Sequence, residues 1–473
     1  MRAQTSEKKN KAGGMATTST LDSSYLEEPI NSDLSHVPGD LGLPVVGKTF
    51  PLLDDYYGLV DEMYKKYGPV FKMGQIGMDT VTCVGAEANK QILLDSKKVF
   101  SNLKGYEPSL GEFYEGGLLL QDFADHKAQR RMFQTAFKFD TMQSYTELLN
   151  NIVRENLAKW DKIEDFRFFP NVKEMLLDIG AQLFLGIADF KGDEAKKISN
   201  IFIEITEGMV GLVRVDSPAL PFTKWRKGKV AMRNMQSYLI GKIEERREGD
   251  GTDMFSIICR EKDEDGNYFS DEMIAKHINF LLFGAHDTTT SNLCYTMQML
   301  AENREFLERA RKQSQELGKP QLDFEDLKGM TELDNIQNET LRMYPPVMMY
   351  SRRTVTDVEI CGVKVPANTI INLPPQYVHF MPEFWDNPEK FDPDRFSPER
   401  AEHKRHSHSF VPFGGGAHKC LGMNFAQMLV KSIMHQILLK YDWNVPAGYD
   451  PKQQTFPMPK QEDDLPLSLK AIA

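Results

Sequence analysis

A run of glycines followed by one cysteine, in the segment FVPFGGGAHKCLG at residues 410–422, constrains the fold of this chain most strongly. Glycines let a backbone approach a large flat group, because no Cβ stands in the way. The apolar stretch MNFAQMLVKSIMHQILLKY follows and predicts a helix that begins just after Cys420. A helix N-terminus favours a thiolate through its dipole and free N–H groups. The segment therefore indicates a thiolate directed at a metal such as a haem iron, and the alternative is a structural cysteine beside a turn.

Composition narrows the function classes. The 473 residues carry a net charge of −11, which argues against a general nucleic-acid binder, and 41% of them are hydrophobic, enough for a large core. No CxxC pair occurs, so neither a disulfide framework nor a structural zinc site is predicted, and a reducing, cytoplasmic location is expected. The cysteines are Cys83, Cys259, Cys294, Cys361 and Cys420.

The chain reads as one domain after a tail. Residues 1–35 are polar and patternless and predict a disordered N-terminal tail, whereas no linker divides residues 36–473. No uncharged apolar stretch of about 18 residues occurs, so no membrane-spanning helix is predicted and a soluble protein is expected. We predict a single domain over residues 36–473.

Apolar spacing predicts a mainly α protein with a small β portion. Residues 59–85 read as a helix followed by two short strands, and residues 86–350 as helices broken by turns. One long helical run is expected from about Asp271 to Arg311, with loops at 105–117 and 213–225. After Pro345-Pro346, residues 354–376 alternate and read as short strands.

The segment LLFGAHDTTTSNL (281–293) places polar side chains inside the long helical run. Consecutive threonines disfavour a helix, and a threonine hydroxyl can bond back to a carbonyl one turn earlier. An acid beside a hydroxyl can hold water and pass protons, which makes Asp287 and Thr288 candidates for acid–base work. The alternative is an ordinary polar helix face.

A third motif, NETLRMYPP (338–346), spaces Glu339 and Arg342 three residues apart, so that they share a helix face. Such pairs are common on surfaces and weak there. Arg395, in the turn-rich segment FDPDRF, is a candidate partner that would lock the pair into a buried network.

With these motifs in order, the chain resembles the cytochrome P-450 family of haem-thiolate monooxygenases. The resemblance runs from VPGDLGLPVVG through GAHDTT, ETLR and PDRF to FGGGAHKCLG, and thus covers most of the chain. It implies the cytochrome P-450 fold and haem b with its iron. It also implies insertion of one oxygen atom from O2, by hydroxylation or oxidative demethylation.

The resemblance also implies roles for individual residues. Cys420 matches the ligand of the iron, Phe413 the aromatic that shields the sulfur, and Gly416 and Gly422 the glycines that shape the loop. The expected contacts of the haem propionates are His126, Arg130, Arg352, with Arg353 as the neighbouring alternative, and His418.

On the same basis, Asp287 and Thr288 match the acid–alcohol pair that delivers protons, with Ala285 in place of a usual glycine. Glu339, Arg342 and Arg395 match a structural network rather than catalysts. By position, the expected substrate contacts are Tyr106, Phe113, Phe283, Ala285, Val347, Met348, Met349, Phe456 and Met458.

The expected substrate is an apolar small molecule, because these candidate contacts are mostly apolar or aromatic. The FGGGAHKCLGMNFA run is similar to members that oxidise sterols, retinoids and terpenoids, and fatty acids stay open. No flavin, nicotinamide or iron–sulfur motif is present, so a separate electron donor is expected, a ferredoxin or flavodoxin with its reductase. Basic residues that can attract an acidic donor are Lys127, Arg130, Arg131, Lys404, Arg405 and Lys419.

Two alternatives remain at this point. A haem-thiolate binding protein without turnover would need Cys420 but not the Asp287–Thr288 pair. A peroxide-driven peroxygenase would need no redox partner.

Overall fold

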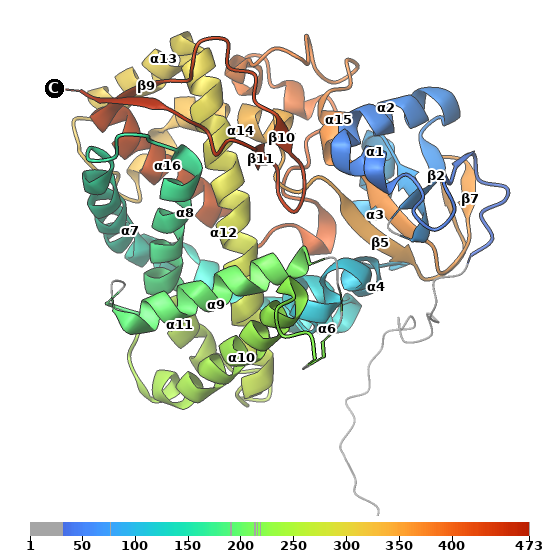
Figure 1. Ribbon diagram of the computed structural model, residues 1–473, viewed down its shortest axis with the longest axis horizontal. Coiled ribbons are helices and arrows are strands. Elements are labelled where there is room, and N and C mark those ends of the chain that lie inside the picture. The colour runs from blue at the N-terminus through green and yellow to red at the C-terminus, as the bar shows by residue number, and fades with distance from the viewer. Residues whose placement is uncertain are drawn as a thin grey trace, which may run out of the picture.

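The computed structural model describes residues 32–75, 77–189, 192–211, 214, 216–217 and 219–472. Helices dominate this part of the chain and strands are few, which confirms the predicted class, mainly α with a small β portion. In Figure 1 most helices gather on one side and the larger sheet lies on the other. Of the predicted tail, residues 1–31 lie outside the described residues, and the single-domain boundary stays a prediction.

The larger sheet has the strand order β1-β2-β3-β8-β5-β4 in the part of the chain that the structure describes. β2 pairs antiparallel with β3, β8 runs parallel to β3, and β5 runs antiparallel to β8. These strands are β1 (Gly39–Asp40), β2 (Val70–Gln75), β3 (Met78–Cys83), β4 (Phe100–Ser101), β5 (Tyr350–Thr354) and β8 (Ile370–Leu373). Smaller pairs are β6 (Val358–Ile360) with β7 (Val363–Val365), β9 (Tyr441–Asn444) with β12 (Ser468–Ala471), and β10 (Gln453–Gln454) with β11 (Lys460–Gln461). The strands predicted after residue 354 therefore form.

The helices divide between the two sides of the molecule. Beside the sheet in Figure 1 lie α1 (Thr49–Asp54), α2 (Tyr56–Tyr67), α3 (Ala86–Leu94) and α15 (Pro375–His379). Helix α4 (Asn102–Tyr106) packs against β5, and the others are α5 (Glu112–Tyr114), α6 (Phe123–Gln134), α7 (Phe139–Trp160), α8 (Phe168–Ile179), α9 (Asp193–Met209), α10 (Lys224–Glu248), α11 (Met254–Arg260), α12 (Asp271–Glu302), α13 (Arg304–Glu316), α14 (Thr331–Met343) and α16 (Met423–Lys440).

Helix α12 is the central element and runs through the helical side in Figure 1. Ser270 caps it by accepting a hydrogen bond from the Met273 N–H, and Asp271 adds a favourable charge to the first turn. Most of its residues are buried, and it packs against α8, α10, α14 and α16. Within its polar segment, His286, Thr289 and Thr290 are buried, whereas Gly284 is exposed.

Two predicted boundaries are wrong. The run from Asp271 to Arg311 is two helices, because Asn303 leaves helical geometry (φ −121°, ψ 70°), and both its backbone N–H and its side-chain amide donate to the Met299 carbonyl. The predicted loop at 105–117 is largely helical, with α4, the π-helix η2 (Glu107–Gly111) and α5. Ser101 caps that run by accepting a hydrogen bond from the Lys104 N–H. A serine at this position favours a helix start, but the glycines that follow favour a loop.

The second predicted loop, at 213–225, ends two residues early, since α10 begins at Lys224 behind the Thr223 cap. Residues 213, 215 and 218 lie outside the described residues.

Buried apolar side chains form one large cluster around α12 and two smaller ones at the sheet. Within the described ranges, no helix is both long and apolar enough to cross a membrane. All five cysteines are free.

Candidate active site

The loop before Cys420 is held in a shape that requires glycine. Gly414 and Gly416 have φ values of 68° and 60°, in the left-handed region that glycine tolerates best. A Cβ on Gly416 would overlap the Leu93 carbonyl oxygen of α3, whereas one on Gly414 would meet only the His418 oxygen at 3.9 Å. The loop therefore lies directly against α3 at Gly416.

Tyr350, which the sequence did not single out, fastens the same loop to strand β5. Its hydroxyl donates to the Val411 carbonyl over 2.7 Å and accepts from the Gly414 N–H over 3.1 Å. Burial raises the pKa of Tyr350, so the hydroxyl stays protonated and can serve both partners. No local sequence pattern around Tyr350 predicts its contact with the loop, because Val411 and Gly414 are far away in the chain.

Cys420 lies at the end of this loop, just before α16. Its N–H donates to the Phe413 carbonyl over 2.9 Å. The side chain is exposed, yet the surrounding protein is dense enough that burial raises the pKa of the thiol. A hydrogen bond from the Gly422 backbone and the charges of Arg130 and Lys419 act in the opposite direction. These donors are suited to stabilise a thiolate.

The structure brings the four expected propionate contacts together near Cys420. His126 and Arg130 come from α6, Arg352 from β5, and His418 from the short helix η9 (Gly416–His418). The rings of His126 and His418 stack at 3.8 Å between centroids, and Arg130 donates to the Lys419 carbonyl over 2.7 Å.

The electrostatics of this cluster favour an anion. Burial, with the charges of Arg130 and Arg352, lowers the pKa of His126 to about 4. Burial and the same charges lower the pKa of His418 well below its usual value. Among the described residues, no carboxylate forms an ion pair with Arg130 or Arg352. Such a set of donors without acidic partners fits the two carboxylates of a bound ligand.

Tyr106 lies beside this cluster rather than in a loop. Burial raises its pKa, and the charge of Arg352 opposes this, together with hydrogen bonds from the Ser351 backbone and the Arg352 side chain. The candidate substrate contact therefore touches a candidate propionate contact. Arg353, the alternative to Arg352, is fully buried in the same strand.

On α12, the predicted acid and alcohol sit in an unbroken helix. The Thr288 hydroxyl donates to the Gly284 carbonyl over 2.8 Å, as expected for a back-bonded threonine. Gly284 is exposed, and a Cβ there would meet no atom within 4 Å. Since residues four apart share a helix face, Thr288 and Gly284 face the same open side.

Asp287 has partners that the sequence did not suggest. Its Oδ1 lies 2.8 Å from His286 Nδ1 and 3.8 Å from Lys173 Nζ. Burial acts to raise the pKa of Asp287, but the His286 hydrogen bond and the charges of His286 and Lys173 outweigh it, so the pKa lies below its usual value. The carboxylate is therefore ionised at neutral pH.

The remaining substrate candidates are dispersed. Phe113 is buried edge-on against Trp225, at 4.9 Å between centroids, and Phe283 stacks on Tyr114 at 4.6 Å. Ala285 lines a small apolar cavity of about 40 Å³ between α8, α9, α12 and α16. Val347, Met348 and Met349 pack against the sheet-side clusters, and Met458 is half-buried. Phe456 is 54% exposed, so any substrate contact there is at the surface.

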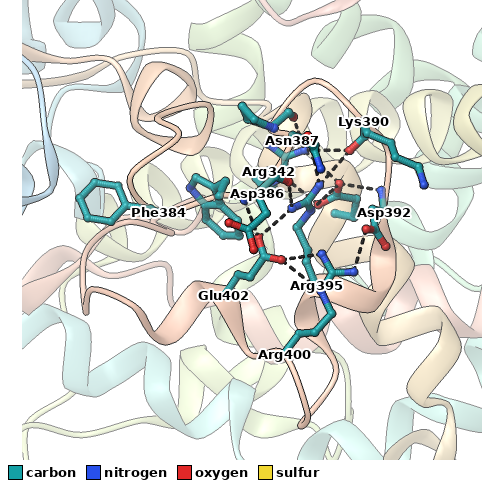
Figure 2. A network of polar contacts seen from close by, with 12 residues as sticks. Arg342, Phe384, Asp386, Asn387, Lys390, Asp392, Arg395, Arg400 and Glu402 are labelled. Carbon is teal, nitrogen blue, oxygen red and sulfur yellow. Dashed lines mark hydrogen bonds and ion pairs between the residues drawn. The ribbon is translucent and has the colours of Figure 1, made fainter.

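Glu339, Arg342 and Arg395 form one buried network, which Figure 2 shows from close by with Arg342 and Arg395 labelled. Glu339 accepts from Arg342 Nε over 2.7 Å and from Arg395 Nε over 3.0 Å, and all three side chains are 0% exposed. Glu402, which sequence reasoning missed, adds a second carboxylate to Arg395 at 2.8 Å. Glu402 also pairs with Arg400, which in turn pairs with Asp392, so the buried network continues into a partly exposed one.

Comparison with known proteins agrees with this geometry. The family model described as Cytochrome P450 matches residues 37–466. A putative cytochrome P450 136 of Mycobacterium tuberculosis is 35% identical over 94% of this chain and 90% of its own length. A taxane 10-beta-hydroxylase of Taxus cuspidata is 26% identical over 89% of this chain and 87% of its own. The solved structure of retinoic acid-bound cyanobacterial CYP120A1 superposes with a TM-score of 0.82 at 27% identity, covering 92% of this chain and 99% of that one.

The residues present fit the haem that this family carries. One thiol with amide and cationic neighbours can ligate the iron, and glycines keep the loop against α3 free of side chains. The cluster of Arg130 and Arg352 lacks acidic partners and can hold the propionates. The chain therefore belongs to the cytochrome P450 family, and it is a haem-dependent monooxygenase.

Proposed function

We propose that this monooxygenase inserts one oxygen atom into an apolar small molecule, with Asp287 and Thr288 delivering the protons. The observation that carries the proposal is the Thr288 hydroxyl, back-bonded to Gly284 on the open side of α12, with the ionised Asp287 next to it. Proton delivery needs an exchangeable hydroxyl and an acid that changes state, and this turn supplies both. Cys420 is the proposed ligand of the iron.

Haem b, when bound, supplies the activation of O2, and a thiolate ligand favours O–O cleavage. The chain's own residues have the remaining tasks. Arg130, Arg352, His126 and His418 are proposed to hold the propionates, and the Gly422 amide to stabilise the sulfur. Thr288 can exchange its bond to the Gly284 carbonyl for one to a reacting oxygen, which moves a proton without unfolding the helix.

The proposed substrate is a steroid, terpenoid, retinoid or fatty acid, oxidised by hydroxylation or oxidative demethylation. Two similar proteins support a substrate of this size and polarity, since one is named as a taxane hydroxylase and the structure of the other contains retinoic acid. In this chain, Phe283 of α12, four residues before Asp287, stacks on Tyr114 of α5 and provides aromatic surface near the acid. Phe283, Val347 and Met348 are proposed to contact the substrate, because partly buried apolar side chains suit such a ligand.

Electrons are proposed to come from a separate ferredoxin or flavodoxin with its reductase. Of the six basic residues considered, Arg131 pairs with Glu264 and Arg405 with Asp386, which neutralises both. Lys127, Lys404 and Lys419 are exposed and form no ion pair within the part of the chain that is described. We propose that these three lysines attract an acidic electron-donor protein by their charge. Five free cysteines support a reducing, cytoplasmic location.

The first test is the absorption spectrum of the reduced, carbon monoxide-bound protein. We expect the red-shifted thiolate band, and its loss in Cys420→Ala. Cys361→Ala is the control, since Cys361 is also exposed and free but lies at a β-turn far along the chain from the loop. A Cys420→Ala protein that keeps the band would refute the ligand assignment.

The second test concerns the protons. We expect Thr288→Ala to divert electrons from product to peroxide, whereas Thr296→Ala, which removes a similar back-bonding hydroxyl two turns later, leaves coupling unchanged. Product formed from hydrogen peroxide alone, at a rate that Thr288→Ala does not alter, would instead support a peroxygenase. A panel of steroids, terpenoids, retinoids and fatty acids, scored by the spectral shift of the haem, then narrows the substrate.

A further inference from the structure

Both ring nitrogens of His286 face hydrogen-bond acceptors. Nδ1 lies 2.8 Å from Asp287 Oδ1, and Nε2 lies 3.3 Å from the backbone carbonyl oxygen of Lys173 on α8. A carbonyl oxygen can only accept, so Nε2 carries a hydrogen. His286 is therefore fixed in one orientation between two helices, with Nδ1 directed at the acid.

The short contact between Nδ1 and Oδ1 also needs a hydrogen. A neutral imidazole with its hydrogen on Nε2 presents a lone pair at Nδ1, and an ionised carboxylate presents lone pairs as well. Two acceptors at 2.8 Å repel each other unless one proton lies between them. Because Asp287 is ionised, the proton belongs to the ring at rest, and the pair is an imidazolium with a carboxylate that shares one mobile proton.

The surroundings keep this proton out of bulk water. His286 is 6% exposed, its ring lies edge-on to Phe202 of α9 at 5.2 Å, and it lines the apolar cavity with Leu176 and Leu282. The titratable groups that face the pair are few in the described chain. Lys173 on α8 places its ammonium 3.8 Å from Asp287 Oδ1, and the buried Tyr114 on α5 senses the charge of Asp287.

We propose that His286 is a positioning residue that holds one exchangeable proton on its hydrogen bond to Asp287, next to Thr288. Transfer breaks the His286 Nδ1–H bond and forms the Asp287 Oδ1–H bond, and no electron moves. The imidazolium becomes a neutral ring that keeps its hydrogen on Nε2, where it donates to the Lys173 carbonyl, and after Asp287 has passed its proton on, a proton from solvent restores the imidazolium. The inference rests on the proposed function, since it needs Asp287 to serve as the acid.

The direct test locates the proton. In the reduced, carbon monoxide-bound holoenzyme, ¹⁵N NMR of the histidine rings, assigned with His286→Phe, reports whether Nδ1 is protonated. Infrared spectroscopy, assigned with Asp287→Asn, reports whether Asp287 is a carboxylate or a carboxylic acid. We expect a doubly protonated ring with a carboxylate. A neutral ring beside an ionised Asp287 would overturn the proposal.

The functional test uses two replacements of different chemistry. His286→Phe keeps a ring against Phe202 but has no donor, so coupled product formation should fall about tenfold and its solvent deuterium isotope effect should rise. His286→Gln retains an amide donor and should restore part of the coupling. Equal coupling in wild type and His286→Phe would overturn the proposal if Thr288→Ala uncouples the enzyme. If Thr288→Ala does not uncouple it either, the proposed function has failed instead.

Discussion

The Nε2 atom of His379 accepts a hydrogen bond from the backbone N–H of Val411 over 3.1 Å. Its other nitrogen, Nδ1, lies 3.0 Å from the Arg342 carbonyl oxygen and must donate to it. Arg342 returns a bond from Nη1 to the His379 carbonyl over 2.7 Å. One buried histidine thus connects the Glu339 network to the loop that carries Cys420.

His379→Phe should destabilise the protein by about 1–3 kcal/mol, because it leaves the Val411 N–H buried without an acceptor. The free energy of unfolding in urea measures the loss, with the carbon monoxide band as a second readout of the loop. His36→Phe is the control, since His36 is exposed and bonds only the Lys364 carbonyl. An effect no larger than that of the control would show that His379 does not brace the loop.

A pH dependence follows from two buried histidines. Burial, and then the charge of Arg342, lowers the pKa of His379 to about 3, and burial lowers the pKa of His277 to about 3. Unfolded histidine titrates near pH 6.5, so below that pH the unfolded chain binds protons that the folded chain does not. Stability is therefore full above about pH 6.5 and falls as the pH drops toward 3.

Each of these histidines should contribute up to about 1.4 kcal/mol per pH unit in that window. His277 bonds Gln129 through Nε2 over 2.6 Å, and His277→Gln removes its titration while keeping a polar side chain. The free energy of unfolding, measured from pH 7 to pH 4.5, should fall less steeply in this variant. The difference in slope should correspond to about one proton fewer taken up on unfolding. Parallel curves would contradict the assignment of His277 as neutral.

The sequence predicted most of the elements and the order of the motifs, because spacing and composition encode them locally. Arg395 was a candidate partner of Glu339 from its turn-rich FDPDRF segment, and the family resemblance supported the pairing of two residues that are 56 apart in the chain. Glu402, Tyr350 and His379 were missed. Each acts through a contact with a distant backbone or acid that no local pattern records.

The site itself was predictable to a similar extent. The GAHDTT motif contains both Asp287 and His286, whose Nδ1 lies 2.8 Å from the Asp287 carboxylate. Helical spacing assigns adjacent residues to different faces, so a contact between residues 286 and 287 is not expected from a helical pattern. The substrate candidates stay predictions: Phe113 is buried against Trp225, and Phe456 is exposed.

Gly416→Ala should reduce the fraction of protein that shows the thiolate band, since the new Cβ collides with the Leu93 carbonyl. Gly414→Ala is a matched control in the same loop. Both glycines have a φ near 60–70°, so each variant bears the cost of a left-handed alanine, about 1–2 kcal/mol. Only Gly416→Ala adds the collision with the Leu93 carbonyl. We therefore expect this variant to lose more of the thiolate band and to bind less haem than Gly414→Ala. Equal losses would mean that backbone conformation alone, and not contact with α3, requires glycine.

Glu339→Gln should be the most damaging single change, because it removes one negative charge between two fully buried arginines. Breaking a buried ion pair in this way costs about 3–5 kcal/mol. Glu402 keeps Arg395 partly compensated, so Arg342 is the side chain left with neutral acceptors, among them the backbone carbonyls of His379, Pro388 and Lys390. Glu316→Gln is the control, because its pair with Lys312 is exposed and should be worth less than about 1 kcal/mol. Urea unfolding of the three proteins, with haem retention read in the same samples, makes the comparison. A loss in Glu339→Gln close to that of the control would mean that the arginines are satisfied by backbone oxygens alone, and that the network contributes specificity rather than stability.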